Sequence, residues 1–214
     1  MKKFDSDGIE REASELISLV GVTPDTLTAA SIEPQNMEVG KANQDVIVRL
    51  TPKNQVPANG FIEIQLPYWF SDPNNPLHYF DSTNVSCTAI SGVNSGLTCT
   101  YNSSNRRLKV ANILTGASSS LMEFQLSGFK NPLSTGGTSG FIIRTSDSQN
   151  GFIDRADVVV TVTQPAVITT ANLSPSSIKT VGELTIMNVI ITNPVPLEAD
   201  CRLKIVFPAE IPIS

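Results

Sequence analysis

The sequence contains few side chains of the kinds that enzymes use for catalysis. The 214 residues include one histidine, His78, and three cysteines. Nucleophilic or acid–base catalysis needs a reactive group with a positioned base, a pair of carboxylates in a cleft, or a metal cluster. The residues beside His78, including Pro76 and Leu77, do not resemble a nucleophile elbow. We therefore expect a protein that is not an enzyme and that uses no cofactor.

The cysteines favour a structural role. Cys87 and Cys99 flank the turn residues 92–96, and a hairpin centred on Val93 would place them opposite each other. Facing positions of an antiparallel pair bring Cβ atoms close enough for a disulfide. We predict this disulfide, with two buried free thiols as the alternative. Cys201 has no partner in view, and its partner, if it has one, is expected beyond Ser214 or in another chain.

Three tripeptides match the acceptor pattern for N-linked sugars. They begin at Asn84, Asn102 and Asn172. Asn84 and Asn102 flank the predicted disulfide hairpin, where an exposed acceptor is expected. Disulfides and N-linked glycans both belong to exported proteins, so the sequence predicts an extracellular or cell-surface location.

Two acidic turns resemble the opening of a calcium loop. They start at Asp5 and at Asp147, and each contains Asp or Asn close to a glycine. Both lack the spaced ligands and the closing glutamate of an EF-hand. Because Asp, Asn and Gly also form ordinary hairpin turns, no metal site is predicted, and calcium stays an open alternative.

Composition excludes two classes of partner. With 15 basic and 20 acidic residues the net charge is −5, which offers little to a phosphate backbone, so nucleic acid is not expected. No apolar run approaches the roughly 20 residues of a membrane-spanning helix, so no membrane contact is expected within this segment. The first residues lack a signal peptide's apolar core, and any export signal or anchor is expected outside this stretch.

Alternating apolar and polar residues predict short strands with one solvent-exposed face. The apolar positions are Val46, Val48 and Leu50; Ile62, Ile64 and Leu66; Leu108 and Val110; and Met122, Phe124 and Leu126. Further runs near 26–33, 84–90, 97–102, 139–146 and 153–162 bring the expected number to about nine, separated by turn residues. Two packed antiparallel sheets bury the apolar faces of such strands against each other, so we expect a β-sandwich.

An irregular stretch, residues 68–82, is rich in aromatic side chains. It contains Trp69, Phe70, Tyr79 and Phe80 among Asp, Asn and Pro residues. An exposed aromatic loop is a common recognition surface. The alternative, which we prefer, is that these rings fold back over the end of the sandwich, because large apolar side chains are costly to leave in water.

The sequence repeats itself at a fixed spacing. The spacing equals the number of residues from Pro34 to Pro175 and is called the repeat offset below. Residues 28–34 reappear as 169–175, and Ile62–Pro67 reappears as Leu203–Pro208 at the same offset. Between these anchors the alignment shifts slightly, since Val39-Gly40 matches 181–182 and Val56-Pro57 matches 195–196. Such shifts fall at turns, where insertions are tolerated. A fixed period indicates tandem repeats.

The amino-terminal residues extend the pattern backwards. Glu10-Arg11 after Gly8 resembles Asp154-Arg155 after Gly151, and Pro24 precedes Pro165 by the repeat offset. We therefore predict the end of one repeat in residues 1–22, a complete repeat in 23–164 and the start of a third in 165–214. An amphipathic helix over 10–20 is the alternative for the first segment.

Three short motifs support a family resemblance. The Thr-rich entry at 26–30, the Val56-Pro57 turn, and Asn131-Pro132-Leu133-Ser134 ahead of 140–144 resemble the tandem immunoglobulin-like repeats of very large surface proteins of ciliates and related protists. The resemblance implies a secreted or surface-tethered array and no catalytic residues. The unpaired Cys201 and the low cysteine content depart from heavily cross-linked surface repeats.

The overall expectation is an all-β protein of tandem immunoglobulin-like antiparallel β-sandwich repeats. Its expected role is structural, in an extracellular filament, coat or stalk. The expected partners are neighbouring repeats of the same or identical chains and N-linked glycans. The alternative is a surface adhesin or ligand-binding module that uses the aromatic loop 68–82.

Overall fold

The structure is a computed structural model. It describes residues 2–4, 10–13, 23–67, 85–136, 140–175, 186–193 and 202–207. These residues form fourteen strands and no helix, so the chain is all-β, as the sequence predicted. Within the same ranges no helix could cross a membrane.

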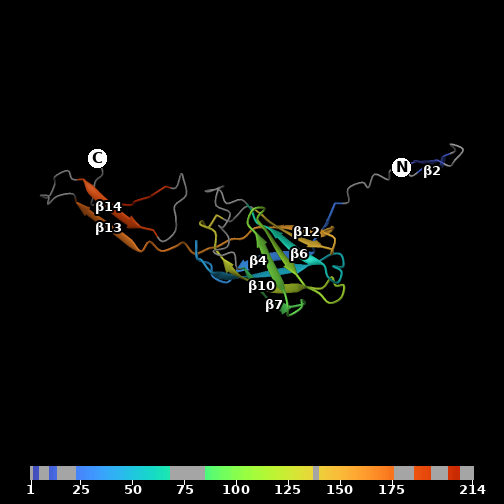
Figure 1. The fold of residues 1–214 in the computed structure, drawn as a ribbon. Coiled ribbons are helices and arrows are strands. Elements are labelled where there is room, and N and C mark those ends of the chain that lie inside the picture. Colours follow the sequence, from blue (N-terminus) through green and yellow to red (C-terminus); the bar gives the residue numbers. More distant parts are fainter. Residues whose placement is uncertain are drawn as a thin grey trace.

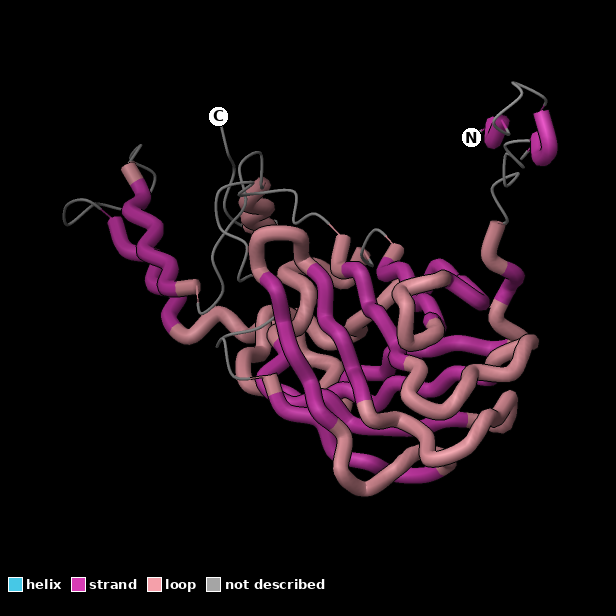
Figure 2. The backbone as a smooth tube through the Cα atoms, turned by 45° about the vertical axis from the view of Figure 1, so that its right-hand side comes forward, coloured by secondary structure: helices cyan, strands magenta, loops and turns pink. Residues whose placement is uncertain are grey.

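Two sheets form the central sandwich (Figures 1 and 2). One has the order β4-β5-β10-β7, made of Ala29–Pro34, Gln44–Thr51, Met122–Phe129 and Ser86–Ser91. The other has the order β3-β12-β11-β6-β9-β8, made of Asp25–Thr26, Phe152–Val158, Phe141–Ser146, Phe61–Gln65, Arg107–Ala111 and Thr98–Asn102. All pairings within these sheets are antiparallel except that of β3 with β12.

The core lies between the two sheets, and the predicted alternation is confirmed. Every apolar position named for the four regular strands is buried. In the four-stranded sheet, Val48 faces Phe124 across the β5–β10 pair, and both are fully buried. Burial of one such side chain stabilises the fold by about 1.5–3 kcal/mol. The alternation therefore fixes which face of each strand points inward.

One predicted strand is divided in the structure. The run at 26–33 contributes to β3 in one sheet and to β4 in the other. The two sheets of the central sandwich, called the complete unit below, therefore contain ten strands, β3 to β12, where the sequence predicted about nine. The Leu27 N–H donates to Arg155 O at 3.0 Å, and the Thr28 N–H donates to Thr51 O at 2.9 Å. The chain thus changes sheets between these two residues. Leu27 is buried at that point and closes one side of the sandwich.

Two further hairpins form sheets of their own. β1 (Lys2–Phe4) pairs with β2 (Glu10–Ala13), and β13 (Thr170–Pro175) pairs with β14 (Met187–Thr192). The alternative helix over 10–20 is wrong for Glu10–Ala13, which is a strand, and its remainder lies outside the described residues.

The carboxyl-terminal hairpin repeats the register of β4–β5. Leu173 pairs with Val189, and one repeat offset earlier Ile32 pairs with Val48. All six pairs of β13–β14 match the six pairs of β4–β5 at this same offset. The bond from Thr28 N–H to Thr51 O also has its counterpart, from Thr169 N–H to Thr192 O at 3.1 Å. The spacing found in the sequence is therefore also a spacing of backbone pairing.

The amino-terminal hairpin repeats the register of β11–β12 in a similar way. Its pairs Lys2↔Ala13, Lys3↔Glu12 and Phe4↔Glu10 correspond to Arg144↔Arg155, Thr145↔Asp154 and Ser146↔Phe152, at a spacing one longer than the repeat offset. The irregularity between the second and third pairs recurs as well. This register matches Glu12 with Asp154, whereas the sequence comparison matched Glu10 with Asp154.

The inner face of the carboxyl-terminal hairpin is uncovered among the described residues. Ile32 is 6% exposed and its counterpart Leu173 is 44% exposed; Val48 is 0% exposed and its counterpart Val189 is 41% exposed. Residues 202–207, which correspond to β6, form no strand. In the sandwich β6 lies between β11 and β9. A strand needs a neighbouring strand for its hydrogen bonds, and the described residues contain no counterpart of β11 or β9 beside 202–207.

Candidate functional site

A disulfide closes one side of the sandwich. Cys87 and Cys99 are bonded, with Cα atoms 5.8 Å apart, which confirms the predicted pair. The predicted hairpin is wrong, because β7 pairs with β10 and β8 pairs with β9, so the two cysteines belong to different sheets. Both strands are sheet edges. The disulfide therefore joins the two layers.

The connection between β7 and β8 crosses from one sheet to the other. Gly92 has a φ of 66°, and a Cβ there would lie 1.9 Å from Leu121 O. The Asn94 N–H donates to Ile113 O at 2.8 Å, and the Asn112 side chain donates to Gly96 O at 2.6 Å. These contacts tie the connection to the segment after β9, which is why the chain does not fold straight back on β7.

The sugar-acceptor candidates lie in different settings. Asn102 is exposed at the end of β8, and its Oδ1 accepts the Ser104 N–H at 3.0 Å, so its Nδ2 stays available. Asn172 is exposed within β13. Asn84 lies outside the described residues. Glycosylation at all three stays a prediction.

Several other candidates also lie outside the described residues. They are the aromatic loop residues Trp69, Phe70, Tyr79 and Phe80, the single histidine His78, and Cys201. Their predicted roles stay predictions.

The acidic turn at Asp147 has an ordinary structural role. Asp147 Oδ1 accepts the N–H groups of Gln149 and Gly151, each at 2.8 Å. Asn150 takes a positive φ of 68° in the same turn. The carboxylate thus organises the β11–β12 hairpin turn. Among the described residues no three His, Cys, Asp or Glu side chains gather in a way that could hold a metal ion.

A buried carboxylate, Asp154, was missed by the sequence reasoning. Its side chain accepts the N–H groups of Lys53 and Asn54, each at 3.1 Å, and the Asn54 Nδ2 at 2.7 Å. Asp154 is fully buried in β12. It fixes the turn after β5 against the other sheet, next to Asp25, whose carboxylate pairs with Lys53 Nζ at 2.9 Å. No local pattern signals this role, because an acidic residue in a strand normally faces water.

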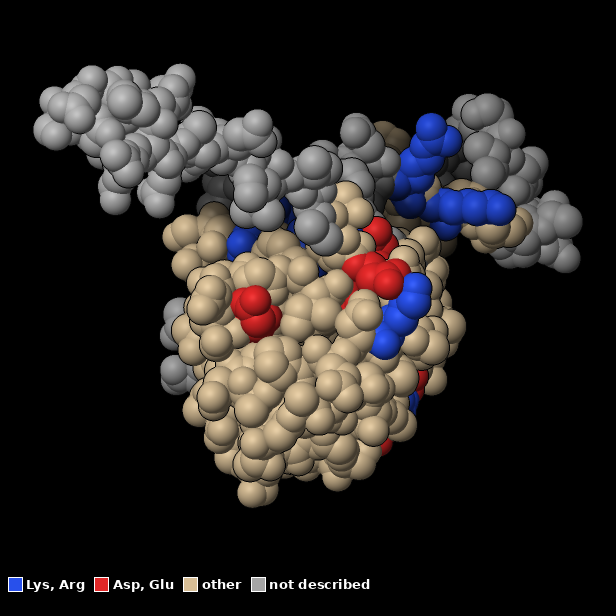
Figure 3. Space-filling view, turned by 90° about the vertical axis from the view of Figure 1, so that its right-hand side faces the viewer, with Lys and Arg blue, Asp and Glu red and all other residues tan. Residues whose placement is uncertain are grey.

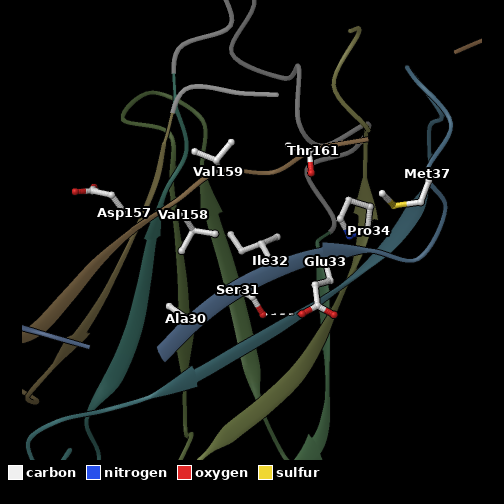
Figure 4. Close-up of a pocket in the computed structure, with 10 residues that line it drawn as sticks. All are labelled: Ala30, Ser31, Ile32, Glu33, Pro34, Met37, Asp157, Val158, Val159 and Thr161. Atoms are coloured by element: carbon white, nitrogen blue, oxygen red, sulfur yellow. Dashed lines mark hydrogen bonds between the residues drawn. The ribbon is translucent and has the colours of Figure 1, made fainter. Parts of the chain in front are cut away.

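The side of the sandwich that carries β4 has a groove. Its volume is about 550 Å³, and residues of β4 and of segment 157–161, which continues from β12, line it (Figure 4). Its two acidic side chains are already paired: Glu33 binds Arg49 and accepts the Ser31 hydroxyl, and Asp157 binds Arg155 at 3.1 Å. The groove therefore presents paired charges and apolar side chains, and the Ser31 hydroxyl in it donates to the Glu33 carboxylate at 2.9 Å.

The charged side chains on the sandwich surface form networks of opposite sign. Arg49 bridges Glu33 and Glu123 across β4, β5 and β10. The hydrogen bond from Arg49, followed by that from Ser31, lowers the pKa of Glu33 below its usual 4.5. On the face of the sandwich drawn in Figure 3 charged side chains are sparse, and red and blue side chains lie next to each other.

The comparisons with known proteins return similar folds at low identity. No known family model matches the sequence, and no curated protein matches it either. A non-cellulosomal cohesin from the hyperthermophilic archaeon Archaeoglobus fulgidus has 13% identity and a TM-score of 0.30 over 62% of this chain and 91% of its own. The human F-spondin reeler domain has 10% identity and a TM-score of 0.29 over 80% and 94% of the two chains.

A third similar structure is the collagen-binding domain of a Staphylococcus aureus adhesin. It has 8% identity and a TM-score of 0.29 over 64% of this chain and 98% of its own. At such identities and TM-scores, none of the three similarities transfers a ligand or a function to this chain.

Proposed function

We propose that this chain is a stretch of an extracellular array of tandem immunoglobulin-like sandwiches that builds a filament, coat or stalk. The observation that carries the proposal is the register of β13–β14, in which every backbone pair repeats β4–β5 at the repeat offset. A chance hairpin would have to reproduce the same register and the flanking bond at Thr169. The matching register of β1–β2 with β11–β12 supports the same interpretation at the other end.

The exposure of the carboxyl-terminal hairpin also supports the proposal. Leu173 and Val189 occupy positions that are buried in the complete unit, yet they are exposed in this hairpin. An apolar sheet face of this kind needs a second layer to cover it. In the array, the covering strands are those of the same repeat that correspond to β6 and the strands after it. The partners of each repeat are thus its own later strands and the neighbouring repeats.

The disulfide supports an extracellular location. Cys87–Cys99 links two edge strands of the sandwich, and disulfides of this structural kind persist in oxidising compartments. The exposed acceptor Asn102 fits the same compartment. The resemblance to surface repeats of ciliates and related protists is compatible with this location and with a role that requires no catalysis.

The proposal is tested on the natural protein and its gene. We expect the coding sequence on both sides of this stretch to contain further units of the same spacing, and we expect purified native protein to appear as beaded rods in negative-stain electron microscopy. Flanking sequence that encodes unrelated domains, together with single globular particles, would overturn the array. Variation of loop 68–82 from copy to copy, with no rods, would favour the adhesin alternative.

A further inference from the structure

The segment that leaves the last strand of the sandwich stays attached to it. β12 ends at Val158, and the following Val160 and Val162 are fully buried. The Gln164 N–H donates to Met37 O at 2.9 Å, and Gln164 O accepts the Val39 N–H at 2.8 Å. Gln164 and Glu38 thereby form a short parallel bridge. The exit segment is held to the sandwich as far as Gln164.

The loop that holds the exit segment is itself fixed by Asn131. This residue is fully buried after β10, and its Nδ2 donates to Asn36 O at 2.6 Å and to Glu38 O at 2.8 Å. Its N–H donates to Lys41 O at 2.9 Å. The loop 36–41 is therefore held by Asn131 on one side and by Gln164 on the other. This arrangement gives a structural reason for the Asn131-Pro132-Leu133-Ser134 motif.

Ala166, two residues after Gln164, still contacts the same sandwich. Ala166 packs against a small apolar cluster that consists of Val39 and Val162, with Leu133 beside them. At the repeat offset shown by β13, Ala166 and Val167 correspond to Asp25 and Thr26, which form β3. The first strand of the following repeat would thus begin at a residue that is packed on the preceding one.

Only one residue separates the last anchored position from Ala166 and Val167, which form no strand here but correspond to β3 in sequence. It is Pro165, whose ring restricts its φ angle to a narrow range and so stiffens the connection. The carboxyl-terminal repeat has matching residues in the sequence. Pro165 lies one repeat offset after Pro24, and 181–182 match Val39-Gly40. The two repeats therefore share a proline at the entry and a Val-Gly pair at corresponding positions of the sequence.

We infer that the surface formed by Val39, Leu133 and Val162 is the docking surface for the first strand of the following repeat. Consecutive repeats are then joined without a free linker and keep a fixed mutual orientation. This inference rests on the proposed array and adds to it how the repeats are connected. Gln164 and Ala166, the residues on the two sides of Pro165, both contact the preceding sandwich, so the chain has little freedom to move before the following repeat begins.

The test uses the whole 214-residue chain and nuclear magnetic resonance relaxation of its backbone amides. We expect the amides of β13–β14 to report the same rotational correlation time as those of the sandwich. Insertion of Gly-Ser-Gly-Ser between Pro165 and Ala166 should abolish this shared tumbling and leave the sandwich unchanged. The same insertion after the exposed Gly116, where a side chain would meet nothing within 4 Å, is the matched control and should keep it.

Asn131→Ala provides a second variant, because it removes the hydrogen bonds that fix loop 36–41. We expect faster hydrogen exchange of the Val39 and Gln164 amides in this variant, together with a loss of shared tumbling. If the unmodified chain forms β13–β14, with cross-strand contacts between Leu173 and Val189, but the hairpin tumbles independently, the docking inference is overturned and the array stands. If those cross-strand contacts are absent, the docking inference is overturned as well, because no folded hairpin then tumbles with the sandwich, whereas the array is decided by the flanking sequence and by electron microscopy. Unprotected Val39 and Gln164 amides in the unmodified chain would also overturn the docking.

Discussion

Cys87 and Cys99 are bonded across two different sheets, at the edge strands β7 and β8, with their Cα atoms 5.8 Å apart. Because the bond joins the layers themselves, its loss should weaken the whole sandwich. We expect the double variant Cys87→Ala/Cys99→Ala to lose about 3 kcal/mol of unfolding free energy, the usual contribution for a loop of this length. Urea unfolding measures this loss.

The control for the disulfide prediction is the unmodified protein under reducing conditions, which should show the same loss. Mass spectrometry of the alkylated, unreduced protein provides an independent measurement. Recovery of both cysteines in alkylated form would contradict the disulfide.

Gly92 and Gly116 form a matched pair for a test of the β7–β8 connection. A Cβ at Gly92 would lie 1.9 Å from the backbone oxygen of Leu121, and its φ is positive, whereas a Cβ at Gly116 would meet nothing within 4 Å. We expect Gly92→Ala to lower the unfolding free energy by about 2 kcal/mol or more. Gly116→Ala should change it by less than about 0.5 kcal/mol. Equal effects of the two substitutions in thermal unfolding would contradict the sheet-crossing path.

The pH dependence of stability should depend on Arg49. The pKa of Glu33 is lowered in the folded protein from its ordinary 4.5, first by the hydrogen bond from Arg49. A carboxyl group with a lowered folded pKa stabilises the fold above its unfolded pKa, and this contribution is lost as the pH falls through the folded value. We therefore expect the unfolding free energy to fall as the pH is lowered below 4.5.

Arg49→Ala should reduce this pH dependence, because it removes the largest cause of the lowered pKa of Glu33 and leaves only the hydrogen bond from Ser31. Lys204→Ala removes the same charge outside the two sheets and should leave the dependence intact. Urea unfolding at a series of pH values measures both variants. An unchanged pH profile in Arg49→Ala would show that the pair with Glu33 contributes nothing.

Asn102 is the acceptor most open to a test of glycosylation. It is exposed at the end of β8, and its Nδ2 is not used in the turn with Ser104. We expect peptides that contain Asn102 from natively produced protein to carry an N-linked sugar, which enzymatic removal and mass spectrometry would detect. Ser104→Ala should abolish the modification, and Ser103→Ala should not. Uniformly unmodified Asn102 in native material would contradict export by a glycosylating route.

The sequence alone predicts the strands in which apolar and polar side chains alternate. Val46, Val48 and Leu50 point inward as expected, because an alternating strand with one wet face has a single favourable orientation. The path between strands was harder to predict. Cys87 and Cys99 are equally compatible with a hairpin and with a crossing between sheets, and the choice depends on contacts of Asn94 and Asn112 with segments far along the sequence.

Two other features depend on tertiary context in the same way. Asp154 is buried because Lys53 and Asn54 supply hydrogen-bond donors from outside its own sheet, and no local pattern indicates such donors. Residues 202–207 have the alternation of β6 but form no strand. Alternation selects a face, whereas strand formation also needs at least one neighbouring strand to pair with.

The parallel pairing of β3 with β12 has a mechanical consequence. These strands lie at the beginning and the end of the complete unit and run in the same direction, so the chain enters the sandwich at one end and leaves it at the other. A pulling force applied through Pro24 and Pro165 would slide β3 and β12 past each other. The hydrogen bonds between them, and those at the Glu38–Gln164 bridge, would be loaded together in shear and not opened one after another as in a hairpin.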